Sequence, residues 1–144
     1  MRWLGVDAGG ARVGLAICDP EERIAVPLEV VPASAAFPAI RSIVARDGVE
    51  GVVIGLALTP RGAEEQSARM ARRLGERIER SLGLPVEYED EHLTTVEAER
   101  LAGRRRPADD IAATLILQQF LDRRRDSQRQ REQREHRGAP DAEA

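Results

Sequence analysis

Apolar residues in this chain come in short runs separated by glycine, proline and charged residues. Two runs, at residues 3–6 and 13–18, lie on either side of a glycine turn, a pattern typical of a β-hairpin. A third strand is expected at residues 24–31. It contains Pro27, which cannot donate a ladder hydrogen bond, so this strand is predicted at a sheet edge or a bulge.

Strands and helices alternate further along the chain. Helical periodicity begins near Ala36, and an uninterrupted apolar run at residues 52–56 predicts a strand buried on both faces. An amphipathic helix is expected at residues 63–82, because apolar side chains recur there at helical spacing. A short strand at 85–89 and a helix from Thr94 follow.

The last apolar element predicts where the folded domain ends. Residues 109–122 are apolar around most of a helix, which must therefore pack against a sheet. From Arg123 onward the chain has almost no apolar residues. We expect one domain over 1–122 and a charged tail over 123–144, either a frayed helix extension or disordered. The element order is β-β-β-α-β-α-β-α-α, an α/β fold in which helices flank a mixed sheet with the first strand near its centre.

Composition agrees with one domain and limits its chemistry. The chain has 144 residues, 42% of them hydrophobic but only 3% aromatic, so Ala, Val, Leu and Ile must build the core. The single cysteine, Cys18, excludes an intramolecular disulfide and a cysteine metal cluster, and we expect it to be buried. No signal peptide or apolar run of transmembrane length is visible, which predicts a cytoplasmic protein without a membrane partner.

Charge is unevenly distributed along the chain. The net charge of −3 argues against a protein that coats nucleic acid non-specifically. Residues 1–99 hold 11 Arg and 17 Asp or Glu, whereas residues 100–137 hold 11 Arg and 6 Asp or Glu. The basic C-terminal part is therefore a candidate contact for a nucleic-acid backbone.

Three acids stand next to apolar elements. Asp7 ends the first predicted strand, Glu91 follows the fifth, and Asp109 opens the last helix. Sites in α/β sheets gather at the carboxyl ends of parallel strands, and acids brought together there need a cation between them. Magnesium suits such oxygen ligands, and two such ions can activate water for phosphodiester hydrolysis. Taken singly, each acid also has another explanation: an Asx turn, a solvated acidic cluster and a helix cap, respectively.

Four segments, occurring in order within residues 3–122, resemble the YqgF/RuvX family. They are GVDAGGARVGLA at 5–16, VVIGLALTPRG at 52–62, DEHLTT at 90–95 and DDIAATLILQ at 109–118. That family comprises ribonuclease H-like proteins known as Holliday junction resolvases or as nucleases that mature the 5′ end of 16S ribosomal RNA.

The resemblance implies a hydrolase acting on nucleic acid. It places Asp7, Glu91 and Asp109 on the three acidic positions of the family site, as catalytic residues and ligands of Mg²⁺ or Mn²⁺. The implied substrate is pre-16S ribosomal RNA or branched DNA, and a pre-ribosomal particle is a candidate partner. The chain is expected to act as a monomer or a homodimer, and two symmetric cuts in a junction would favour the dimer.

Side chains that would bind the substrate are expected around these acids. Two residues depart from the family pattern: His92 replaces an arginine, and Ala57 replaces a proline. Histidine would hold phosphate well only when protonated. The substrate-binding candidates are Arg12, His92, Thr95, Arg104 and Arg105.

Two other classes of protein fit parts of the sequence. A non-catalytic ribosome-assembly or nucleic-acid-binding protein would explain the acidic first 99 residues and the histidine at position 92. An ATP-binding domain of the actin and sugar-kinase type also begins with an aspartate and glycine hairpin. The length of 144 residues argues against it, because that fold needs two such domains.

Overall fold

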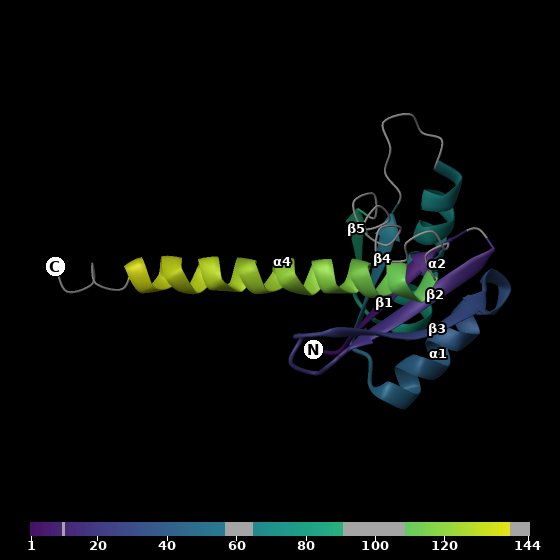
Figure 1. Cartoon of the computed structure of the whole chain (residues 1–144), viewed down its shortest axis with the longest axis horizontal. Helices are drawn as coiled ribbons and strands as arrows, with labels where there is room; N and C mark the ends of the chain where they lie inside the picture. Colours follow the sequence, from purple (N-terminus) through teal and green to yellow (C-terminus); the bar gives the residue numbers. More distant parts are fainter. Residues whose placement is uncertain (10, 57–64, 91–108, 139–144) are drawn as a thin grey trace.

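The computed structural model describes residues 1–9, 11–56, 65–90 and 109–138. The described part holds a five-stranded sheet with helices on both faces (Figure 1). Its strands are β1 (Trp3–Ala8), β2 (Arg12–Cys18), β3 (Ala25–Pro32), β4 (Gly51–Leu56) and β5 (Val86–Asp90). Its helices are α1 (Ala36–Asp47), which follows the short 3₁₀ turn η1 (Ala33–Ala35), then α2 (Glu65–Leu82) and α4 (Asp109–Gly138).

The sheet is mixed, with strand order β3-β2-β1-β4-β5. Strand β1 runs antiparallel to β2 and parallel to β4, and β4 is parallel to β5. The first strand is therefore central, as predicted. The predicted hairpin is also confirmed. β3 is an edge strand whose register shifts where Ala16 faces Pro27, because proline interrupts the ladder. The helix expected from Thr94 lies outside the described residues.

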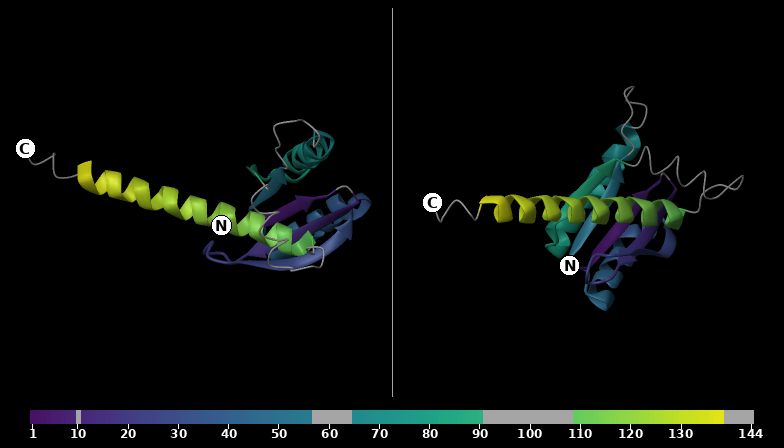
Figure 2. Two further views of the ribbon diagram at one scale, coloured as in Figure 1. Left: turned by 45° about the horizontal axis from the view of Figure 1, so that its top comes forward. Right: turned by 60° about the vertical axis from the view of Figure 1, so that its left-hand side comes forward.

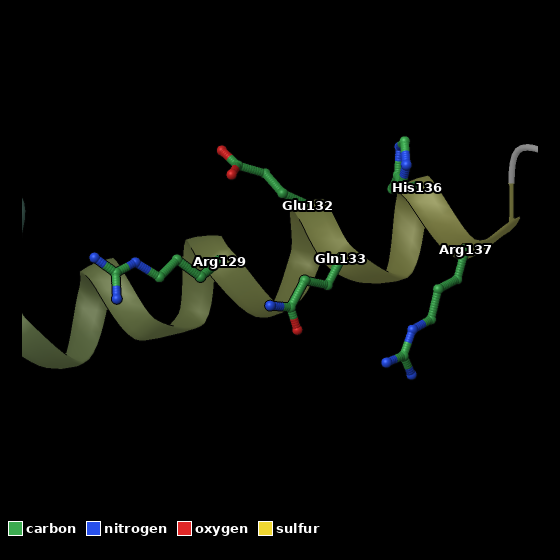
Figure 3. Close-up of a pocket in the computed structure, with 5 residues that line it drawn as sticks. All are labelled: Arg129, Glu132, Gln133, His136 and Arg137. Atoms are coloured by element: carbon green, nitrogen blue, oxygen red, sulfur yellow. The ribbon is translucent and has the colours of Figure 1, made fainter.

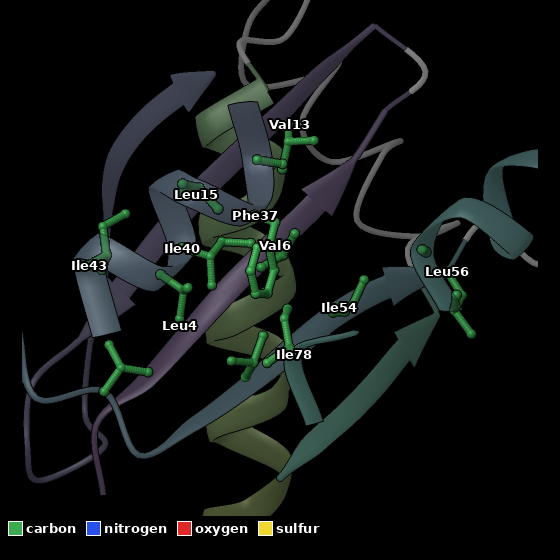
Figure 4. Packing of buried hydrophobic residues seen from close by; sticks show 14 residues of the cluster. Leu4, Val6, Val13, Leu15, Phe37, Ile40, Ile43, Ile54, Leu56 and Ile78 are labelled. Carbon is green, nitrogen blue, oxygen red and sulfur yellow. The ribbon is translucent and has the colours of Figure 1, made fainter. Parts of the chain in front are cut away.

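Helices α1 and α2 cover one face of the sheet (Figures 1 and 2). Side chains from β1, such as Leu4 and Val6, pack there with Ile40 of α1 and Ile78 of α2 (Figure 4). Each of these four side chains is fully buried. Because successive strand residues point to opposite faces, Trp3 and Gly5 face the other way, toward α4.

Helix α4 covers the second face. Its residues Ala113, Leu117 and Phe120 form a separate buried cluster with Trp3 of β1 and Val53 of β4. The predicted burial of β4 on both faces is confirmed, since all six of its residues are buried. Sequence periodicity alone could not assign the two clusters to faces, because β4 is apolar at nearly every position.

Helix α4 and β1 approach each other closely at Gly5. A Cβ atom on Gly5 would lie 2.7 Å from Leu117 Cβ and 2.9 Å from the Ala113 carbonyl oxygen. Real Cβ atoms do not come that close, so only glycine permits this packing distance. The same contact line continues at Trp3, whose ring meets Phe120 edge-on with centroids 4.7 Å apart.

Helix α4 continues without a break to Gly138. Residues 126–137 are all exposed, and this part of the helix extends well beyond the sheet in all three views (Figures 1 and 2). A helix that is polar on every side is typical of a solvent-exposed segment. None of the described helices is both long enough and apolar enough to cross a membrane.

The single cysteine is buried, as predicted. Cys18 Sγ accepts a hydrogen bond from the backbone N–H of Trp3 at 3.1 Å. Burial raises the pKa of the Cys18 thiol, which keeps it in the unreactive neutral form. Cys18 therefore acts as a small core side chain.

We predict that Gly5→Ala lowers the free energy of unfolding by about 1–3 kcal/mol, because the added methyl group overpacks the contact with α4. Urea denaturation followed by circular dichroism measures the loss. Gly48→Asn is the matched control. Gly48 has φ +66° and open space within 4 Å of the position that a Cβ would take, and asparagine tolerates that backbone conformation. An equal loss in both variants would contradict the close-approach argument.

Candidate active site

Asp7 lies near the C-terminal end of the central strand β1 and is half-buried. Strands β1, β4 and β5 are parallel, so their carboxyl ends lie at one edge of the sheet. Alternation along β1 places Asp7 on the face that α4 covers, with Trp3 and Gly5. This is the position that the sequence predicted for a catalytic carboxylate.

The first turn of α4 lies next to Asp7. Phe120 meets Trp3, while Leu117 and Ala113 meet Gly5, so α4 runs antiparallel to β1. Asp7 lies two residues beyond Gly5 on β1. The part of α4 at the level of Asp7 is therefore closer to the start of the helix at Asp109 than the part that meets Gly5. The fold thus brings the beginning of α4 to the end of β1 that carries Asp7. The Asp109 side chain itself is outside the described part of the structure.

Glycines occupy the positions beside Asp7 on both neighbouring strands. Gly14 of β2 is directly opposite Asp7. On the other side, Val6 is level with Ile54, and one residue further the same register places Gly55 of β4 beside Asp7. Neither neighbouring strand therefore projects a side chain next to Asp7 on the α4 face.

The other members of the predicted site are only partly placed. β5 ends at Asp90, the residue before Glu91 in the sequence, and this end of β5 lies at the same edge of the sheet as Asp7. Among the side chains that the structure describes, no group of three or more His, Cys, Asp or Glu residues is arranged to hold a metal ion. The candidates outside the described residues are Glu91, His92, Thr95, Arg104 and Arg105.

Arg12 is the one substrate-binding candidate within the described part of the chain. It is exposed, and it begins β2 two residues before Gly14. By alternation it therefore lies on the same face as Asp7. It forms no hydrogen bond or ion pair with any other described residue. That Arg12 binds substrate stays a prediction.

Sequence reasoning missed a second buried acid in this region. Glu89 lies in an acidic segment whose members are usually solvated, but in the structure it is only 2% exposed. Its Oε2 accepts a hydrogen bond from Gln119 Nε2 at 2.9 Å, and its Oε1 is ion-paired with Arg123. The spacing of Gln119 and Arg123, four residues apart on a helix, was the only available sequence signal.

A second acid holds the middle of α4 against the sheet. Glu22 Oε1 accepts hydrogen bonds from Arg124 Nε at 2.7 Å and from Trp3 Nε1 at 2.9 Å. Arg125 donates to the carbonyl oxygens of Glu22 and Arg23. Burial would raise the pKa of Glu22, but the hydrogen bond and positive charge of Arg124 lower it overall. The contacts between α4 and the rest of the domain therefore extend along the helix as far as Arg125.

One surface hollow lies on the C-terminal part of α4. It is lined only by α4 side chains, which point to different sides of the helix in Figure 3. It begins at Arg129, sixteen residues beyond Ala113, or roughly 24 Å along the helix axis. It is therefore remote from Asp7. Its lining residues are Arg129, Glu132, Gln133, His136 and Arg137.

Comparison with solved structures identifies the class of fold. The chain is similar to RuvC of Thermus thermophilus in complex with a Holliday junction substrate, with a TM-score of 0.61 and 16% sequence identity over 86% of this chain and 95% of that one. A second Thermus thermophilus RuvC structure gives a TM-score of 0.60 at 17% identity, covering 88% of this chain and 97% of that one. The predicted ribonuclease H-like fold is confirmed.

Sequence comparison identifies the family. The RuvX family, described as Holliday junction resolvase, matches residues 1–123. A protein of Chloroflexus aggregans is 41% identical over 85% of this chain and 94% of its own length, and one of Lactobacillus gasseri is 39% identical over 85% and 96%. Both carry the name "Putative pre-16S rRNA nuclease". This chain belongs to the RuvX family of nucleases.

We predict that Glu22→Gln lowers the free energy of unfolding at pH 7 by about 1–2 kcal/mol, because it removes a charge-assisted hydrogen bond to α4. A lowered pKa in the folded state means that this stabilisation is present above the unfolded pKa and is lost as pH falls through the folded one. Urea denaturation at several pH values should show the difference between variant and wild type shrinking as pH falls below the unfolded carboxyl pKa and vanishing below the lowered folded one. Glu29→Gln, an exposed acid on β3, should show no such difference.

Proposed function

We propose that this chain is a divalent-metal-dependent endonuclease that hydrolyses phosphodiester bonds of pre-16S ribosomal RNA during maturation of its 5′ end. The observation that carries the proposal is the position of Asp7, half-buried at the carboxyl end of the central strand and beside the start of α4. The names of relatives that are 39–41% identical support RNA as the substrate.

The residues proposed to hold the metal are Asp7, Glu91 and Asp109. The elements that carry or lead to them reach one edge of the sheet: β1 holds Asp7, β5 leads to Glu91, and α4 begins at Asp109. Carboxylate oxygens are the donors that Mg²⁺ and Mn²⁺ prefer, so this donor set fits either ion. When bound, such ions supply an activated water and stabilise the leaving oxygen of the phosphodiester.

The side chains of the protein would position the nucleic acid against this edge. Gly14 and Gly55 have no side chains beside Asp7, which leaves room for a phosphodiester to approach the carboxylate. Arg12, exposed on the same face, is proposed to hold a backbone phosphate. His92, Thr95, Arg104 and Arg105 are proposed as further substrate contacts.

The exposed part of α4 is proposed to contact the nucleic-acid backbone away from the cleavage site. Residues 126–137 are exposed, and the arginines among them make no ion pair with other described residues. Phosphates neutralised by arginine release counterions, which strengthens binding at low salt. A pre-ribosomal particle would offer such a backbone beyond the cleaved bond.

We predict that Asp7→Asn reduces Mg²⁺-dependent cleavage of a pre-16S RNA fragment by about a hundredfold or more, because several kcal/mol of charge stabilisation by the metal are lost. Cleavage of labelled RNA followed on a denaturing gel measures the change. Asp47→Asn is the matched control, since Asp47 lies on α1, on the opposite face of the sheet. That variant should cleave like wild type.

Other outcomes of this experiment would select other functions. Cleavage of a four-way DNA junction in preference to the RNA would favour a Holliday junction resolvase. RNA binding without cleavage under any divalent metal would favour a non-catalytic ribosome-assembly protein. Activity unchanged in Asp7→Asn would refute the assignment of the site.

We predict that the salt dependence of RNA binding reports the proposed phosphate contacts. Arg12→Ala should reduce the slope of log K against log salt concentration by about one, the value expected for one lost phosphate contact. Deletion of residues 126–144 should weaken binding and flatten the slope further. Fluorescence anisotropy at several salt concentrations measures both. Arg41→Ala, on α1, is the control, and a slope unchanged by the deletion would exclude a role for the α4 extension.

A further inference from the structure

Glu89 is a buried carboxylate that the proposed mechanism does not use. It is the only charged residue within the described part of the chain that is buried, with 2% of its surface exposed. Burial of a carboxylate is costly unless the charge is paired and hydrogen-bonded. The partners of Glu89 therefore indicate what its burial achieves.

Both partners come from α4. Gln119 Nε2 donates a hydrogen bond to Oε2 at 2.9 Å, and the Arg123 guanidinium is ion-paired with Oε1. The ion pair is the main contact of Oε1, since no hydrogen bond of good geometry reaches that oxygen from the described residues. The Arg123 side chain is 62% exposed, so it reaches from solvent toward a fixed buried carboxylate.

Glu89 is level with Asp7 across the sheet. The β4–β5 register places Gly55 opposite Glu89, and Asp7 is beside Gly55 on the other side. Two strand spacings separate Asp7 from Glu89, roughly 10 Å. Glu89 also lies two residues before Glu91. The contact with α4 is thus made at the point where β5 leads to a proposed metal ligand.

Few other contacts connect α4 with β5. The helix packs mainly on β1, β2 and β3, and only lightly on β5. The contacts of Glu89 with Gln119 and Arg123, called here the Glu89 clasp, are therefore the principal polar connection between the two elements. An ion pair to a buried carboxylate adds little stability compared with apolar packing, but removing Arg123 would leave the Glu89 charge buried without its cation, whereas Arg123 itself is solvated.

We propose that Glu89 is a positioning residue: the Glu89 clasp holds the end of β5 against α4 and so sets the distance between Glu91 and the acids Asp7 and Asp109. This inference rests on the proposed function, because it assumes that these three acids share a metal. It assigns a role to Glu89, Gln119 and Arg123 that does not require any of them to touch substrate or metal.

Two substitutions test the clasp. Glu89→Gln keeps the shape of the side chain and an oxygen for Gln119, but removes the charge that Arg123 pairs with. Arg123→Ala removes the cation and leaves the buried carboxylate, whereas Arg123→Lys retains a cation. The control is Arg41→Ala, an exposed arginine on α1 that forms no ion pair with other described residues.

The expected result is a specific loss of metal affinity. In Glu89→Gln and Arg123→Ala, the Mg²⁺ concentration for half-maximal cleavage should rise about 10–100-fold, as is usual when a residue supporting metal ligands is changed. The KM for RNA should stay within about twofold, since these side chains bind no substrate. Arg123→Lys should be intermediate, and Arg41→Ala should match wild type.

Calorimetric titration with Mn²⁺ gives a readout that does not depend on cleavage. Weaker Mn²⁺ binding by folded Glu89→Gln than by wild type would support the clasp. An unchanged metal requirement in folded variants, or a lower Tm as the only effect, would overturn it and leave Glu89 with a structural role alone. Glu89→Gln retains the shape of the side chain and an oxygen that can accept a hydrogen bond. Its Mn²⁺ affinity therefore tests the Glu89 clasp even if Arg123→Ala fails to fold.

The two proposals fail in different ways. Wild type that binds Mn²⁺ but cleaves no nucleic acid would refute the proposed function, and the calorimetric comparison would still decide the clasp. Normal cleavage with equal metal affinity in Glu89→Gln would refute the clasp and leave the proposed function intact. Wild type that binds no Mn²⁺ would contradict both.

Discussion

The close approach of α4 to the central strand at Gly5 is the constraint on which the rest of the structure depends. A Cβ atom there would lie 2.7 Å from Leu117 Cβ, so the helix can rest on the sheet only because position 5 lacks a side chain. This contact sets the position of α4 along the direction of β1. It therefore also sets how near the start of the helix comes to Asp7, two residues further along the strand.

Apolar packing sets the depth of α4 and its position along β1, and two acids, the partly buried Glu22 and the buried Glu89, restrain its rotation. Glu22 holds Arg124 on one side of the helix, and Glu89 holds Arg123 and Gln119 on the other. Charged hydrogen bonds are directional, whereas contacts among leucine and alanine side chains are not. The consecutive arginines Arg123 and Arg124 thus reach different acids, Glu89 on β5 and Glu22 in the connection between β2 and β3.

Membership in the RuvX family explains why these restraints converge on one edge of the sheet. Three elements that are distant in sequence carry or lead to the proposed acids, and their relative positions must be kept to within fractions of an ångström for metal chemistry. Parallel strands bring β1 and β5 to the same edge, and α4 returns to it from the opposite direction. The long polar end of α4 then extends away from the site.

Most of the fold could be predicted from the order of the amino acids. Apolar runs, the glycine turn and Pro27 predicted the hairpin, the edge strand and the buried β4, because alternation and proline geometry act locally. Four motifs in order identified the family and predicted a site at the end of β1. The sequence could not reveal that Glu89 is buried, since its neighbours in the acidic segment look equally solvated. It also could not show that Arg123 and Arg124 contact different acids. Both features are visible only in the folded chain, because burial and ion pairing depend on which distant side chains the packing of α4 brings within reach.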